Sequence, residues 1–227
     1  EKSNETTAIP ELLKPLALQG TIVTIDAMGT QTKIAETIRR GEADYVLCVK
    51  DNHPNLLDSI MFAGLGPEGA LQPCSTDEVT ATKPNHGRLE VRRCWAYDAV
   101  DRLYKHEQWK DIRSFAIIER ERTQDGRTSI ERAYFISSLP ADAARLARAV
   151  RSHWEVENRL HWCLDVQLAD DQSRTRSGFA ANNLAIVRHI VMNLLRLNTT
   201  SKVGIKNKRL MASASDEFRA EVLGFMT

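Results

Sequence analysis

The segment HWEVENRLHWCLDV, residues 153–166, holds two glutamates, two histidines and two tryptophans. Carboxylates bind hard cations and act as general acids or bases, and imidazoles are common zinc ligands. This spacing therefore predicts either metal binding or proton transfer, and the first question is which glutamate carries the chemistry.

Helical phase separates the two glutamates. We placed residues 142–165 on one helix at about 100° per residue, which puts Glu155 about 200° from Glu157, toward solvent. A lone ionised carboxylate on an apolar face costs several kcal/mol unless it is paired or binds metal. Glu157 is therefore expected either to pair with a core arginine or to do chemistry. The apolar residues within about 60° of Glu157 are Leu146, Val150, Leu160 and Leu164.

The two histidines leave a second chemistry open. His153 and His161 flank Glu157 at four residues on either side, which is compatible with a zinc hydrolase, although the HExxH pattern is absent. A histidine beside tryptophan is more often packed and hydrogen-bonded than metal-bound. Trp154 and Trp162 are expected in the core rather than stacked on bases.

Two strand–helix units must position the N-terminal part of such a site. Residues 21–26, TIVTID, form a β-branched run that ends in Asp26, and a helix is expected in TKIAETIRRG. DYVLCVK (44–50) is a second buried strand, and HPNLLDSIMFAGLG a second helix. This alternation predicts a parallel α/β layer.

The middle of the chain changes from a helical period to a period of two. EVTATKPNHGRLEVRRCWAYD, FAIIERERT and SIERAYFISS alternate apolar and polar residues around turn signals. We therefore expect a β-rich antiparallel insertion at 76–135 between a first core part at 1–75 and a helical part at 136–227. SKVGIKNKRL, near the C-terminus, is expected to be a solvated tail.

Composition agrees with a globular protein: 42% of residues are hydrophobic, 27% are charged, and the net charge is +1. Neither a membrane span nor a signal peptide is evident, so a cytoplasmic location is expected. The four cysteines lack CxxC spacing, which argues against a zinc ribbon.

Several motifs carry a family resemblance. TIVTIDAMGTQ, DYVLCVKDNHPNLLDSI, HGRLEVRR, YFISSL and HWEVENRLHWCLDVQLADDQSRTR occur in this order. In these motifs the chain resembles the H-repeat-associated family of bacterial insertion-sequence transposases, over essentially its whole length. The resemblance implies an RNase H-like α/β core with a DDE triad and two divalent ions, Mg²⁺ or Mn²⁺. Asp26 matches the second acid and Glu157 the third.

The resemblance also has departures. The wider transposase clan places tyrosine, arginine, glutamate and lysine where this chain has Val150, His153, Glu157 and Leu164. The family's first aspartate lies upstream of residue 1, so we expect an N-terminally truncated fragment that is inactive alone. A catalytically dead DNA-binding or oligomerisation remnant is the alternative.

The partners implied are double-stranded DNA, at transposon ends and target, and a second copy in a homodimer. The DNA-contact candidates are Lys50, Asn52, Arg88, Arg174 and Arg176. Solvated loop positions, or arginines that only aid solubility, are the alternative. Lys206, Lys208 and Arg209 are expected to add weak binding that is independent of DNA sequence.

Overall fold

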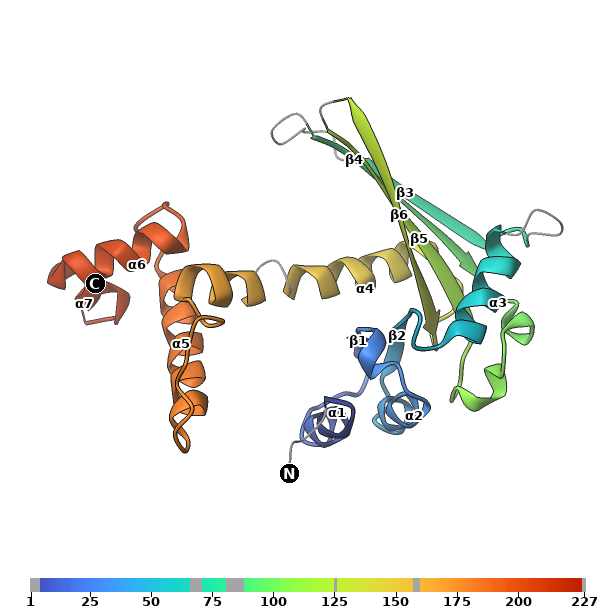
Figure 1. Ribbon diagram of the computed structural model, residues 1–227, viewed down its shortest axis with the longest axis horizontal. Helices are drawn as coiled ribbons and strands as arrows, with labels where there is room; N and C mark the ends of the chain where they lie inside the picture. Colours follow the sequence, from blue (N-terminus) through green and yellow to red (C-terminus); the bar gives the residue numbers. More distant parts are fainter. Residues whose placement is uncertain (1–4, 66–70, 81–87, 125, 157–159, 226–227) are drawn as a thin grey trace. The chain divides into compact units, whose positions relative to one another are not determined.

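The computed structural model describes residues 5–65, 71–80, 88–124, 126–156 and 160–225, with residues 5, 6 and 88 described by their backbone alone. The chain forms two compact units, Glu1–His153 and Trp154–Thr227, each treated by itself below. The first unit holds the sheet, and the second is helical (Figure 1).

A six-stranded mixed sheet organises the first unit, in the order β1-β2-β6-β5-β4-β3. β1 and β2 pair in parallel, and the remaining neighbours pair antiparallel. The parallel α/β layer and the antiparallel strands predicted in 76–135 are therefore confirmed. The strands are β1 (Ile22–Ile25), β2 (Asp44–Val49), β3 (Ser75–Thr80), β4 (Arg88–Tyr97), β5 (Ser114–Gln124) and β6 (Arg127–Ser137).

The antiparallel strands continue the same sheet as the parallel pair. β6 pairs with β2, with Val46 opposite Ser137 and Val49 opposite Tyr134. The mixed α/β class agrees with an RNase H-like core. The division into parts at 1–75, 76–135 and 136–227 stays a prediction, because a shared sheet does not define domain boundaries.

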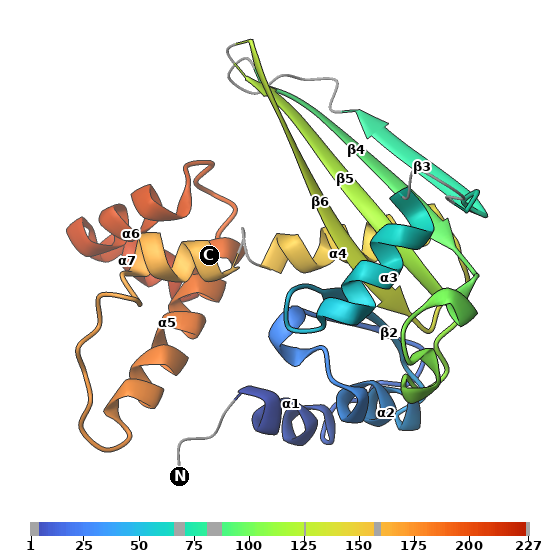
Figure 2. The same ribbon diagram turned by 45° about the vertical axis from the view of Figure 1, so that its right-hand side comes forward.

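Helices cover both faces of the sheet. One face packs with α2 (Thr32–Arg40) and α3 (Pro54–Leu65), and the other packs with α4 (Ala143–Val156). Figure 2 shows α3 in front of the strands and α4 behind them. The alternation of β2 explains this, because Leu47 and Val49 belong to the first apolar cluster and Val46 and Cys48 to the second.

Short helices complete the first unit. Those in the described residues include α1 (Glu5–Leu13) and the 3₁₀ turns η1 (Ala27–Gly29), η3 (Val100–Arg102) and η4 (His106–Gln108). η1 matters for function, because it follows β1 directly and begins at Asp26.

The second unit contains the π-helix η6 (Cys163–Gln167) and the helices α5 (Ala180–Leu197), α6 (Ile205–Ala214) and α7 (Asp216–Val222). The segment expected to be a solvated tail is thus largely helix α6, and that prediction was wrong. Lys208 is buried, and its ammonium donates to the carbonyls of Leu195 (3.1 Å) and Asn198. These carbonyls at the end of α5 lack helical partners, so the lysine stabilises the helix end.

Two further expectations about this region were wrong. Trp154 and Trp162 are 49% and 51% exposed, so they are not core residues. Glu155 is half-buried rather than exposed. The apolar cluster that includes α4 ends at Val150, so the turn after it lies beyond the packed face. In the part of the chain that the structure describes, no helix has the length and hydrophobicity to cross a membrane.

The anchoring of α4 is open to a stability test. Leu146 is fully buried against the sheet, whereas Arg148 on the same helix is exposed. We expect Leu146→Ala to lower the free energy of unfolding by about 2–5 kcal/mol, because it removes apolar contacts and leaves a cavity. Arg148→Ala is the control and should stay within about 0.5 kcal/mol. Urea unfolding followed by circular dichroism measures both, and equal stabilities would show that α4 is not anchored there.

Candidate functional site

Asp26 lies at the carboxyl end of β1 and caps the next turn. Its backbone is extended, and its Oδ1 accepts a hydrogen bond from the Ala27 amide at 2.6 Å. Aspartate is a preferred residue at this position, because its carboxylate satisfies an amide that the helix leaves open. The rest of the side chain is accessible, with 62% of it exposed. The turn thus fixes the carboxylate and leaves it facing solvent.

Lys50 faces Asp26 from the neighbouring strand. β1 and β2 run parallel, so their carboxyl ends meet at one edge of the sheet. The Lys50 ammonium lies 3.2 Å from Asp26 Oδ1. Oδ2 of Asp26 has no hydrogen-bond partner among the described residues. One carboxylate oxygen is therefore held, and the other is open to a ligand.

The surroundings keep Asp26 ionised. Partial burial raises its pKa, but the Ala27 amide and the Lys50 ammonium outweigh that effect, so the pKa lies below its ordinary value. The Asp26 carboxylate in turn raises the pKa of Lys50. A carboxylate with a lowered pKa is present as an anion at neutral pH, which is the form that binds cations.

Hydrogen bonds to backbone carbonyls hold the loops on both sides. Asn52 Nδ2 donates to the Ala27 carbonyl at 2.6 Å, and the His53 ring contacts the Thr30 carbonyl at 2.6 Å. The buried Thr30 hydroxyl donates to the Cys48 carbonyl at 2.6 Å. These bonds join the loop after β1 to the end of β2 and the loop that follows, so they fix the distance between Asp26 and Lys50.

A contact between β1 and α4 was not foreseen. Thr24 Oγ1 and His153 Nδ1 lie 3.2 Å apart, although 129 residues separate them. Thr24 and Asp26 are two residues apart at the end of β1, and His153, when protonated, also lowers the pKa of Asp26. The sequence signal was His153 itself, four residues before Glu157, but nothing in the sequence named Thr24 as its partner.

The structure brings only some of the predicted site residues together. Asp26, Lys50 and Asn52 share one edge of the sheet. Arg88 begins β4, with β2, β6 and β5 between it and β1, so the strands alone are roughly 19 Å apart across the sheet. Arg88 also lies opposite Gln124, near the tip of the hairpin. Arg174 and Arg176 lie exposed in the second unit, between η6 and α5. Glu157 lies outside the described residues.

Only part of the predicted metal site lies in the residues that the structure describes. In the described ranges, no group of three or more histidine, cysteine, aspartate or glutamate residues could hold a metal ion. Both the predicted divalent-ion site and the alternative zinc site depend on Glu157, so neither is tested. Within the described part, Asp26 is an accessible carboxylate of the kind that fits a hard cation, and it lies at this edge.

Lys208 and Arg209 were expected to bind DNA weakly, and this was wrong for Lys208, which is buried against carbonyls at the end of α5. The Arg209 guanidinium donates to the Gln167 carbonyl. These side chains hold the second unit together.

Comparison with known proteins identifies the family. A family model described as Transposase DDE domain matches residues 1–194. The chain belongs to this family. It is 36% identical to the putative protein YbfL and to the H repeat-associated putative transposase YhhI, both of Escherichia coli K12, over 98% of this chain and 60% of each relative. The putative transposase YncI of E. coli O157:H7 is also 36% identical, over 98% of this chain and 57% of its own length.

The chain thus spans about three fifths of the length of these curated relatives. Members of the family generally use divalent metal ions. The resemblance drawn from the motifs is confirmed, and the roles of individual residues are taken up below.

The contact between Asp26 and Lys50 is testable in the folded protein. We expect Lys50→Met to raise the pKa of Asp26, because the cation that favours its ionised form is lost. Carboxyl ¹³C NMR titration measures the shift. Lys110→Met is the matched control, since Lys110 pairs with Asp111 instead.

The lowered pKa of Asp26 determines how its contribution to protein stability changes with pH. Because the folded pKa of Asp26 is lowered, its stabilising contribution is present above the ordinary aspartate value of about 3.9 and is lost as pH falls through the folded pKa. Identical titration of Asp26 in both variants would contradict the assigned contact.

Proposed function

We propose that the chain is the catalytic part of a DDE transposase that cleaves and rejoins DNA strands with divalent cations. Asp26 and Glu157 serve as two of its acids. The observation behind this proposal is the carboxylate of Asp26, which is ionised and accessible at the edge where the parallel strands β1 and β2 both end. The chain also belongs to the Transposase DDE domain family. The zinc and remnant alternatives gain no comparable support.

The contact between Thr24 and His153 supports the pairing of Asp26 with Glu157. His153 lies on α4 and contacts the strand that ends at Asp26. Glu157 follows His153 by four residues, which is about one turn at helical spacing. The proposed pairing of Asp26 with Glu157 rests on this spacing in the sequence together with the contact of His153.

The chemistry needs carboxylates at this edge. Two Mg²⁺ or Mn²⁺ ions, when bound, activate the attacking oxygen and stabilise the leaving oxygen in phosphodiester cleavage. Oδ2 of Asp26 is open to such a cation, while Oδ1 stays fixed by the Ala27 amide. The exposed Lys50 ammonium pairs with this carboxylate, and it would contact a DNA phosphate if a cation took its place at Asp26.

The remaining partners rest on the family. We propose double-stranded DNA as substrate and a homodimer as the active form, because two transposon ends must be held together. Asn52 acts through the backbone that it fixes at Ala27. Arg88, Arg174 and Arg176 remain proposed phosphate contacts, and the last two are exposed as such a role requires.

A strand-cleavage assay tests the two acids. We expect Asp26→Asn and Glu157→Gln each to abolish nicking of supercoiled DNA in Mg²⁺ or Mn²⁺, because each removes a charged ligand. Glu155→Gln is the matched control and should keep activity. The substitutions are made in the longest gene product that contains this chain, since the relatives are longer. Cleavage that survives Glu157→Gln would place the chemistry elsewhere.

Metal binding has a separate readout. Fe²⁺ with ascorbate replaces hard divalent cations and cuts the nearby backbone through hydroxyl radicals. We expect cuts close to Asp26 and close to Glu157, and the loss of both sets in Asp26→Asn. Cuts that persist in that variant would contradict a shared site. Tightly bound stoichiometric zinc, found by elemental analysis, would favour the zinc alternative.

A further inference from the structure

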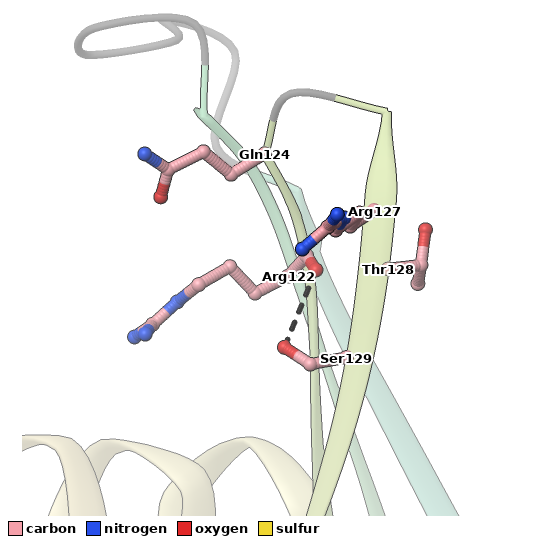
Figure 3. Close-up of a pocket in the computed structure, with 5 residues that line it drawn as sticks. All are labelled: Arg122, Gln124, Arg127, Thr128 and Ser129. Carbon is pink, nitrogen blue, oxygen red and sulfur yellow. Dashed lines mark hydrogen bonds between the residues drawn. The ribbon is translucent and has the colours of Figure 1, made fainter.

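The tip of the β5–β6 hairpin forms a pocket that the proposed catalytic site does not use. Its volume is about 530 Å³, and it is lined by Arg122, Gln124, Arg127, Thr128 and Ser129. Figure 3 shows Arg122, Gln124 and Ser129 projecting to one side of the hairpin and Thr128 to the other. The cross-strand register agrees, because Arg122 lies opposite Ser129 and Gln124 opposite Arg127.

This pocket is on the α4 side of the sheet. The row of Cys94, Ile118 and Ala133 belongs to the apolar cluster that includes α4, and the rows beyond it carry the charged residues. Gln124 lies six positions beyond Ile118 along β5, which is about 20 Å of strand. The hairpin is therefore an arm that extends past the core, with two arginines near its end.

The two faces of this arm differ in charge. On the face away from α4, Arg93 contacts Glu78, Glu119 and Glu121, and Arg132 contacts Glu119. Each charge there has an opposite partner. On the α4 face, the described charged side chains are the arginines Arg92, Arg120, Arg122 and Arg127 and the acids Asp77, Glu90 and Glu131. Four cations against three anions leave a surplus of one positive charge, and Asp77 lies beside the apolar row of Cys94 rather than near the tip.

The excess positive charge of this face lies at the pocket. Arg92 pairs with Glu90, and Arg120 pairs with Glu131. Arg122 lies opposite Glu90 in the register and lowers the pKa of Glu131, yet its buried Nε has no hydrogen-bond partner among the described residues. A buried donor without an acceptor is destabilising, and an anionic ligand would supply the missing acceptor. Arg127 is exposed beside it.

We propose that Arg122 and Arg127 bind a phosphate of the DNA backbone at the tip of this hairpin. The guanidinium groups supply charge-assisted donors, and the Ser129 hydroxyl, which donates to the Arg122 carbonyl, lies within the same pocket. The site rests on the proposed DNA substrate and adds a contact on an arm distant from Asp26. Because backbone contacts carry no base information, the arm positions DNA without selecting its sequence.

Fluorescence anisotropy with a labelled 20-base-pair duplex tests the site in the full chain. We expect Arg122→Gln/Arg127→Gln to weaken binding about tenfold at low salt and to reduce the slope of log K against log salt by about 0.9, since the two arginines neutralise one phosphate. Arg40→Gln/Lys110→Gln is the charge-matched control, because both residues are exposed and pair with nearby acids. The control should change binding less than twofold.

The outcomes separate this site from the proposed function. If the wild-type chain binds DNA and the arginine variant binds equally well, the hairpin site is overturned while the transposase proposal stands. An equal loss in the control overturns it too, because the effect is then one of net charge. A wild-type chain that does not bind the duplex contradicts both. Arg127→Gln alone, at an exposed position, should weaken binding about threefold, and it decides the matter if the double variant unfolds.

Discussion

The fold of the first unit depends on β2. Unlike its neighbours β1 and β6, this strand is buried along nearly its whole length. Its residues alternate between the two apolar clusters, so a change in its register would turn both sets of side chains to the wrong face. β2 also joins the two halves of the sheet, because it pairs in parallel with β1 and antiparallel with β6. This strand therefore also fixes the position of the candidate site at its carboxyl end.

The parallel pairing has an electrostatic consequence. Two strands that end at the same edge bring Asp26 and Lys50 together, and the lysine keeps the carboxylate ionised without burying it. A buried carboxylate would be costly without a partner and would bind protons in place of metal. An exposed carboxylate held by one oxygen avoids that cost. The arrangement therefore suits the proposed role of this edge, which is to accept a cation beside a charged DNA strand.

The two faces of the long β5–β6 hairpin differ in how their charged side chains are paired. Beyond the apolar rows, one face is closed by ion pairs around Arg93 and the buried Glu119, which hold the strands in register. On the other face, Arg122 and Arg127 near the end of the arm form no salt bridge with another residue that the structure describes. Closure on one side stabilises the arm, and the open side leaves charge available for a ligand.

The sequence alone determined the elements and the family. Period two in 76–135 predicted the antiparallel strands, the β-branched runs before Asp26 and Lys50 predicted the parallel pair, and the ordered motifs identified the transposase family. The apolar stripe through Leu146 and Val150 correctly gave the packed face of α4. These properties follow from local periodicity, because backbone geometry sets the direction of each side chain from its position in the element.

Only the tertiary structure decided which side chains meet. It paired Asp26 with Lys50 and Thr24 with His153, and it buried Lys208 at the end of α5. It also exposed Trp154 and Trp162, which their composition had suggested as core residues. Such contacts depend on strand order and on where a packed surface ends. Neither is encoded in the spacing of neighbouring residues, since periodicity gives the direction of a side chain and not the partner that it reaches.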